Sequence, residues 1–293
     1  MKRAIVLCLL LAAGGISIAA AEFQQAPAAL QTEKVKDNLY MIRGAGGNTA
    51  VFITDKGVVL VDTKNPGNGQ AILDQVRKVT DKPVTLLINT HTHPDHTGSN
   101  EFFGATVDSV VHENTKTNMT KMKEFAGDKA QFLPKRTYKD TMSIGQGKDQ
   151  IDLYYFGPGH TNGDTFVVFR ALRTVHAGDM FAGKNTPFVD ANNGGSAVNY
   201  GRTLAKAAST LKDIDSVITG HSTVMTHADL KEYADFNNDF ITWVEGQIKA
   251  GKTVDAAAME YAIPEKYKGY TITQFGGGIR NNIQTAYNEL GKK

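Results

Sequence analysis

Histidine and aspartate residues follow apolar runs at several turns of this chain. Five histidines and two aspartates at such turns are candidate metal ligands: His91, His93, Asp95, His96, His160, Asp179 and His221. Neutral imidazole binds zinc, iron and related divalent ions, and a carboxylate can bridge two cations and lower their mutual repulsion. The sequence therefore predicts a site for two divalent metal ions, with Zn²⁺ the favoured metal.

The densest part of this pattern, residues 91–96, follows an apolar segment at residues 84–89. This segment is rich in branched side chains and too short for a typical helix, so it predicts a buried strand. If residues 90–93 stay extended, the two-residue period of a strand places His91 and His93 on one side, where both reach one ion. Pro94 favours an extended His93 and bends the chain, so that Asp95 and His96 can face a second ion.

The other three histidines of the chain are interpreted as structural: His112, His176 and His227. A lone histidine is more often a satisfied polar group or a surface residue than a metal ligand. His176 precedes Asp179 in an apolar strand, so it could form a hydrogen bond behind the site. The candidates outside residues 91–96 are also weak signals one by one, but together they complete one coordination set.

The motif His-x-His-x-Asp-His at residues 91–96 resembles the signature of the metallo-β-lactamase-fold hydrolase superfamily. The resemblance spans nearly all of the chain after residue 21. It implies two ligand sets and a bridge: His91, His93 and His160 for one ion, Asp95, His96 and His221 for the second, and Asp179 between them. It also implies an α/β fold, the αββα four-layer sandwich of two mixed β-sheets flanked by helices. Periodicity alone supports only a mixed α/β assignment.

The residue at position 179 differs between branches of that superfamily. Zinc β-lactamases usually carry cysteine or serine there, whereas glyoxalase II-like thioesterases, lactonases and related hydrolases carry the bridging aspartate. Asp179 therefore makes the chain similar to the second branch. The expected reaction is cleavage of an ester, lactone, thioester or amide, and cleavage of lactams is not excluded.

The predicted mechanism needs no side-chain nucleophile. Two divalent ions that share a water molecule lower its pKa from about 15.7 toward neutrality, so the attacking group would be a metal-bridging hydroxide. Asp95 is the candidate catalytic residue, because its carboxylate could orient the hydroxide and carry a proton to the leaving group.

Three other functions stay open at this point. They are a β-lactamase-type lactam hydrolase, an iron-dependent sulfur or oxygen oxidoreductase of the same fold, and a noncatalytic metal-binding or scaffold protein. Relatives that reduce oxygen commonly carry glutamate at the position of His93, and sulfur-oxidising relatives usually bind one iron through fewer ligands. The complete set of seven ligands favours hydrolysis, and an open two-metal site in a noncatalytic protein would serve no reaction.

Residues 1–21 predict a cleaved secretory signal peptide. Lys2 and Arg3 precede an apolar run, and residues 19–21 are alanines, the small residues that a signal peptidase requires. An uncleaved anchor is the alternative, but the apolar part is shorter than the roughly 20 residues that span a bilayer. We therefore expect a periplasmic or secreted protein without stable membrane insertion, with residues 22–293 as a single domain that includes the C-terminal helices.

Composition limits the partners of the chain. The 32 Lys+Arg residues include Lys2 and Arg3, so 30 remain after signal cleavage, against 30 Asp+Glu, and the mature chain is formally neutral. Nucleic acids normally require a basic surface, so a small-molecule substrate is expected and a nucleic acid is not. The single cysteine, Cys8, lies in the predicted signal, so stability must come from a core and bound metal. The sequence does not indicate an oligomeric state.

Hydrophobic patterns predict an alternation of strands and helices. Further strands are expected at residues 39–42, 50–54, 58–61, 106–111, 151–156, 166–169, 175–177 and 217–219. Helices are expected at residues 72–79, 204–211, 230–248, with a Thr226/Asp229 capping pair, and 279–290. The loop 44–48 and the segment 181–196 are predicted to overhang the metal ions. Within that segment, Lys184 is interpreted as an exposed lysine, with pairing to a substrate carboxylate as the alternative.

Overall fold

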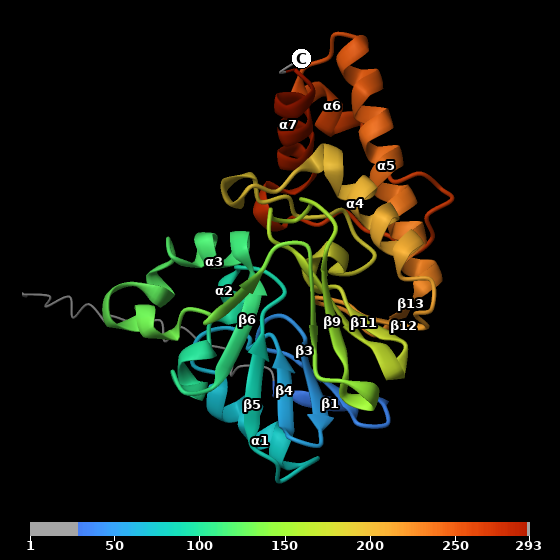
Figure 1. The fold of residues 1–293 in the computed structure, drawn as a ribbon. Helices are drawn as coiled ribbons and strands as arrows, with labels where there is room; N and C mark the ends of the chain where they lie inside the picture. The colour runs from blue at the N-terminus through green and yellow to red at the C-terminus, as the bar shows by residue number, and fades with distance from the viewer. Residues whose placement is uncertain (1–28, 292–293) are drawn as a thin grey trace, which may run out of the picture.

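The computed structural model describes residues 29–291, which form two β-sheets packed face to face between helices (Figure 1). The strands of the first sheet lie in sequence order: β1 (Gln31–Lys36), β2 (Leu39–Arg43), β3 (Thr49–Thr54), β4 (Gly57–Val61), β5 (Val84–Ile88), β6 (Asp108–His112) and β7 (Arg136–Tyr138). Strands β1 to β4 form an antiparallel meander, whereas β4 to β7 pair in parallel. The first sheet is therefore mixed.

The second sheet has the order β13-β12-β11-β10-β9-β8. Its strands are β8 (Thr141–Ile144), β9 (Ile151–Tyr155), β10 (Thr165–Phe169), β11 (Thr174–His176), β12 (Ser216–Ile218) and β13 (Met225–Thr226). Only β11 and β12 pair in parallel among these described strands, and the other pairs are antiparallel.

Helices cover the outer faces of both sheets. They are α1 (Gly69–Arg77), α2 (Pro94–Thr97), α3 (Glu113–Met119), α4 (Ala197–Thr210), α5 (His227–Lys249), α6 (Val254–Glu260) and α7 (Gly278–Leu290). Ile72 and Val76 of α1 pack on the first sheet, while Leu204 of α4 and Leu230 of α5 pack on the second. Helices α6 and α7 stand beside the upper part of α5 (Figure 1). The predicted four-layer sandwich is confirmed.

Successive side chains of a strand face opposite sides of the sheet, so one sheet contributes to two hydrophobic cores. In β3, Ala50 and Phe52 point between the sheets, whereas Val51 points toward α1. The Phe52 ring lies 5.0 Å from the Phe169 ring of β10, measured between centroids. Because successive strand residues face opposite sides, the apolar run of β3 fills the core between the sheets and the core beneath the helix.

Several elements differ from the prediction. Strands β1, β7, β8 and β13 and helix α6 were not predicted, and the strand expected at 106–111 begins at Asp108. Strand β1 has the polar sequence QTEKVK and is half-exposed, so it carries no apolar alternation and forms by pairing with β2 at the sheet edge. The predicted capping pair is confirmed, since Thr226 and Asp229 form a reciprocal capping box at the start of α5.

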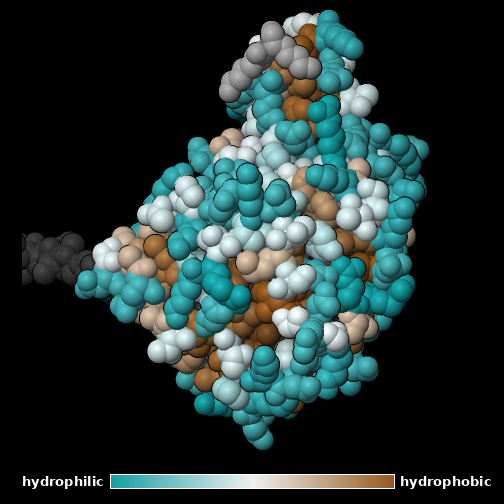
Figure 2. Space-filling model, viewed as in Figure 1, coloured by the Kyte–Doolittle hydropathy of each residue, from teal (hydrophilic) through white to brown (hydrophobic). Residues whose placement is uncertain are grey.

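The face seen in Figure 2 is mostly hydrophilic, and hydrophobic residues reach the surface near its lower centre. Within residues 29–291, no helix is long and apolar enough to cross a membrane. The predicted signal peptide, with Cys8, lies outside the described residues.

Candidate metal centre

All seven predicted ligands lie in connecting segments that follow strands, at one end of the two sheets, with Asp95 and His96 in the short helix α2 and Asp179 in a 3-10 turn. Residues 91–96 follow β5, His160 follows β9, Asp179 follows β11 and His221 follows β12. The structure brings these loops together into groups whose ligand atoms lie within 4.8 Å of one another. Segments more than one hundred residues apart in sequence thus meet at one place, and metal binding by them stays a prediction.

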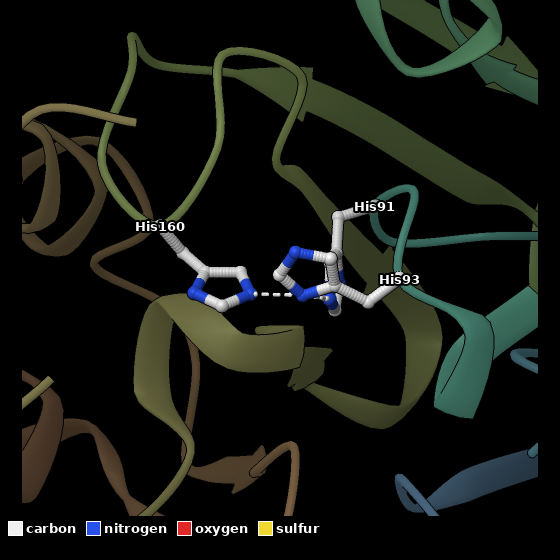
Figure 3. A group of neighbouring side chains, drawn as sticks. All are labelled: His91, His93 and His160. Carbon is white, nitrogen blue, oxygen red and sulfur yellow. Dashed lines mark hydrogen bonds between the residues drawn. The ribbon is translucent and has the colours of Figure 1, made fainter. Parts of the chain in front are cut away.

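His91, His93 and His160 form the first group, with their rings turned toward one another (Figure 3). His93 Nδ1 lies 3.2 Å from His91 Nε2 and 2.9 Å from His160 Nε2. Nitrogens bonded to one tetrahedral zinc ion at 2.0–2.1 Å are about 3.3 Å apart. The observed spacing is therefore close to that of a metal coordination set.

Outer partners decide which nitrogen of each ring faces inward. His93 Nε2 lies 2.7 Å from Asp190 Oδ2, and His160 Nδ1 lies 2.7 Å from the carbonyl oxygen of Phe188. Because a carbonyl accepts only, and a carboxylate does so when ionised, these ring nitrogens are assigned as the protonated donors. The inward nitrogens of His93 and His160 then present lone pairs to the same point.

Asp62 likewise fixes the ring orientation of His91 and His96. This fully buried carboxylate lies 2.7 Å from His96 Nδ1 and accepts a 2.7 Å hydrogen bond from Thr90 Oγ1. Thr90 Oγ1 in turn lies 3.0 Å from His91 Nδ1. One carboxylate at the end of β4 therefore orients a ligand in each group, in the manner of carboxylates behind zinc-bound histidines.

Asp95, His96 and His221 form the second group. His221 Nε2 lies 3.2 Å from His96 Nε2 and 3.3 Å from Asp95 Oδ2, again near the spacing of ligands on one ion. Asp179 lies between the groups: its carboxylate is 3.2 Å from the Nε2 atoms of His96 and His221 and 3.7 Å from that of His160.

The donor set fits two divalent cations. Asp179 Oδ1 is buried and forms no hydrogen bond among the described residues, although the Nε2 atom of His96 lies 3.2 Å away. A buried carboxylate oxygen without a partner is costly, and a cation would satisfy it. Inward lone pairs of imidazoles at about 3 Å separation would also repel unless they share a cation.

Burial and charge set the protonation of the two groups differently. Burial lowers the pKa of His160 to about 4, with His93 adding to the effect, and burial together with His96 lowers that of His91. Burial also lowers the pKa of His221, but Asp179 and Asp95 outweigh it and raise the pKa to about 9. His91 and His160 are therefore held neutral, as metal coordination requires, while the carboxylates around His221 attract positive charge.

The backbone corrects one detail of the predicted motif and confirms another. Residues 90–92 form a bend rather than an extended strand, so the strand-period argument for His91 and His93 is wrong, although the bend still brings their nitrogens together. His93 is extended, with φ −62° and ψ 147°, and Pro94 begins the short helix α2. A proline suits that position because it needs no amide donor and its φ is already helical.

The three histidines interpreted as structural all form hydrogen bonds outside the two ligand groups. His112 caps α3, and His227 lies 2.9 Å from the carbonyl oxygen of Ala208. His176 lies 3.1 Å from the carbonyl oxygen of Asn48 and accepts from the amide of Gly178, next to Asp179. His176 thus supports the backbone behind the candidate centre, as predicted.

A cleft of about 530 Å³ opens beside the seven residues. It is lined by His93, Pro94, Asp95, Asp179, Ala182, Asn185, Thr186, Phe188, Asp190, Asn192, His221, Thr273 and Phe275. The predicted segment 181–196 therefore contributes to its wall. The loop 44–48 does not line the cleft; Gly47 instead packs against the His96 ring, where a Cβ would lie 2.2 Å from a ring carbon.

Lys184 is neither an exposed lysine nor a residue of the cleft wall. Its side chain is half-buried, with Nζ 2.7 Å from Asp229 and 3.1 Å from Glu232. Lys184 is therefore paired with the two carboxylates beside it, and it does not line the cleft.

A larger cavity of about 840 Å³ lies near the opposite end of β5 and contains none of the seven candidate ligands.

Sequence reasoning missed Asp62, the contact of Asp190 with His93, and Phe275, whereas Phe188 lies in the predicted segment 181–196. Asp62 follows the apolar strand β4 in the same way as the ligands follow theirs, so its position carried a usable signal. Asp190 and Phe275 carried none, because only the folded chain shows that they meet His93 and Phe188.

The fold and the paired ligand groups define an αββα sandwich with a candidate two-metal centre at one end. A family model for the metallo-beta-lactamase superfamily matches residues 43–221. The chain belongs to this superfamily, whose members are mostly metal-dependent hydrolases.

Individual relatives agree with this membership. The metallo-beta-lactamase type 2 of Elizabethkingia meningoseptica is 32% identical over 183 residues, which are 58% of this chain and 67% of that protein. The crystal structure of DIM-1 metallo-beta-lactamase has a TM-score of 0.61 at 18% identity, covering 72% of this chain and 99% of its own. A double mutant of the sec-alkyl sulfatase PisA1 has a TM-score of 0.73 at 14% identity, covering 89% and 50%. The last two similarities show the fold alone.

Removing the charge of Asp190 tests its support of His93. In Asp190→Asn the acceptor of the 2.7 Å contact loses its charge, so we expect zinc affinity to fall by about 10-fold with little change in fold. Competition with a chromophoric chelator measures this affinity. Asp74→Asn on the exposed face of α1 is the matched control, and equal affinities of the two variants would contradict the role of Asp190.

Proposed function

We propose that this chain is a zinc hydrolase of the bridging-aspartate branch, which cleaves an ester, lactone or thioester with two metal ions. The observation that supports this proposal best is the position of Asp179, whose carboxylate lies within 3.7 Å of ligand nitrogens in both groups. A carboxylate that reaches two sets of inward lone pairs suits a pair of divalent cations.

Bound divalent cations would supply an activated water molecule and would polarise the acyl oxygen. The chain itself positions the reactants. Asp95 lies on the cleft wall, is partly exposed, and contacts His221 at 3.3 Å. Burial raises the pKa of Asp95, but the contact with His221 and the charge of His96 together outweigh it and leave the pKa lowered. An ionised Asp95 oxygen can accept a proton from the attacking water and deliver it to the leaving group.

Replacing Asp95 with asparagine separates this proton transfer from binding. We expect Asp95→Asn to keep the fold and to lower kcat by about 100-fold, the lower end of typical general acid–base contributions. Steady-state kinetics paired with metal counting measures both properties. Unchanged hydrolysis at full metal occupancy would contradict the assignment.

Lactam hydrolysis is the second candidate function. It is favoured by the relative in Elizabethkingia meningoseptica, which is named a metallo-beta-lactamase. Asp179 favours the first candidate, because it stands where zinc β-lactamases usually carry cysteine or serine. A third candidate is an iron-dependent redox enzyme that uses the same ligands. Identification of the bound metal distinguishes this candidate from the two hydrolases.

Element-resolved metal counting, paired with an activity screen on a lactone, an ester, a thioester and a β-lactam, tests the proposal. Two zinc ions per chain and hydrolysis of an acyl substrate are expected. One iron with oxygen consumption would replace the proposal by an oxidoreductase, and cleavage of the β-lactam alone would replace it by the second candidate. Full zinc occupancy without any hydrolysis would indicate a noncatalytic protein.

We further propose that the protein acts outside the cytoplasm as one domain over residues 22–293. The support is the signal-like sequence of residues 1–21, together with the formally neutral remainder of the chain. The metal counting is therefore best done on protein recovered from the periplasm or the medium, where the mass of the chain also reports the cleavage site.

A further inference from the structure

We propose that the cleft beside the candidate metal centre selects substrates with an uncharged, apolar arm and discriminates against an arm that ends in a carboxylate. This inference rests on the proposed function and specifies the substrate class of the same site. Its basis is the chemistry of the cleft wall beyond the candidate ligands.

The wall offers an anionic arm no positively charged side chain. Among the described residues that line the cleft, none is a lysine or an arginine, and the polar ones outside the ligand groups are Asn185, Thr186, Asp190, Asn192 and Thr273. The nearby Lys184 is paired with Asp229 and Glu232. A carboxylate on the part of the wall beyond the candidate ligands and their metal ions would lose hydration without gaining an ion pair with a side chain, which is unfavourable.

The carboxylate of Asp190 adds to this discrimination. It lies on the cleft wall and is bound to His93 at 2.7 Å and to Asn193 at 2.6 Å, which hold it in place. A second carboxylate nearby would be repelled at short range. The wall therefore favours an arm without negative charge.

Two aromatic rings provide the apolar part of the wall. Phe275 is 70% exposed, and its ring meets the Phe188 ring edge-on, with centroids 5.1 Å apart. Phe188 also stacks on the His93 ring at 5.8 Å and an interplanar angle of 28°. An exposed aromatic ring at the mouth of a small-molecule cleft indicates a surface that an apolar group covers on binding.

Gly276 allows this arrangement of the rings. Its φ is +62°, and a Cβ at this position would lie 2.3 Å from the Phe188 ring. The turn before α7 can therefore pass close to Phe188 and place Phe275 beside it only with glycine here. The C-terminal region thus contributes directly to the wall of the cleft.

Matched esters test the inference on the zinc-loaded protein. The pair is 4-nitrophenyl hexanoate and mono(4-nitrophenyl) adipate, which share a leaving group and an acyl chain of equal length but differ in a terminal carboxylate. We expect kcat/KM to be at least about 10-fold higher for the hexanoate, since a desolvated carboxylate without a partner costs more than the 1.4 kcal/mol that this ratio represents. Equal values, or a preference for the adipate, would overturn the inference.

Two variants assign the effect to the wall. Phe275→Ala should raise KM for the hexanoate by about 10-fold, because it removes a large apolar contact. Asn185→Lys should shift the ratio of kcat/KM toward the adipate by about 10-fold, because it supplies the missing cation. Phe102→Ala is the matched control, since Phe102 is also an exposed ring packed edge-on against a phenylalanine, but it does not line the cleft. An equal KM for the hexanoate in Phe275→Ala and Phe102→Ala would contradict the role of the wall.

Binding without turnover distinguishes failure of this inference from failure of the proposed function. Calorimetry with N-phenylhexanamide and N-phenyladipamic acid measures the same difference in charge on amides. If neither these esters nor any lactone or thioester of the activity screen is cleaved, but the hexanamide binds more tightly and loses affinity in Phe275→Ala, the proposed function fails and the inference is retained. If the two amides bind equally, or neither binds, the inference fails whatever the esters show.

Discussion

Asp179→Asn is expected to lower kcat/KM by about 10⁴-fold and to leave the chain with less than two metal ions. The carboxylate of Asp179 lies within 3.7 Å of nitrogens from both ligand groups. Several kcal/mol of metal-ion catalysis depend on two ions held side by side, and each 1.36 kcal/mol is tenfold in rate.

Metal counting and kinetics on the same samples check this result. The matched control is Asp215→Asn, because Asp215 is an exposed aspartate that pairs with Arg173 and neither residue lines the cleft. Asp179→Asn with two metal ions and normal turnover would show that the two groups do not depend on a bridge. A loss of activity in both variants would instead indicate a general loss of folding.

Removal of the metal ions is expected to abolish hydrolysis and to lower the melting temperature by about 10 °C. A ligand present at 1,000 times its Kd stabilises the folded state by about 4 kcal/mol, and 1 kcal/mol corresponds to about 2–4 °C in a chain of this size. The physical reason lies in the inward lone pairs of the imidazoles and in Asp179 Oδ1, which lack donors among residues 29–291.

Differential scanning calorimetry before and after dialysis against a chelator measures this change. Return of both activity and melting temperature on addition of Zn²⁺ is the control for irreversible damage. An unchanged melting temperature together with unchanged hydrolysis would show that the seven residues do not hold metal in the working protein.

The strands that deliver the ligands were predictable because their signal is local. Strands β5, β9, β11 and β12 are largely buried and read as short, mostly apolar runs, and the polar residues after them mark the end of the sheet. The Thr226/Asp229 capping box was predictable for the same reason. Edge strands such as β1 and β8 were not, since half-exposed edges tolerate polar sequences and form only through their neighbours.

In the candidate site, too, some features were predictable from the sequence and others depended on the fold. The sequence by itself determined which seven side chains could bind metal, because their types and their places after apolar strands are readable along the chain. Only the tertiary structure decided which nitrogen of each ring faces inward, since Asp62, Asp190 and the Phe188 carbonyl come from distant segments. It also decided that Lys184 is paired elsewhere and that Phe275 joins the cleft. Local sequence specifies the chemistry of a side chain, whereas its partners, its burial and its orientation depend on contacts that exist only after the chain has folded.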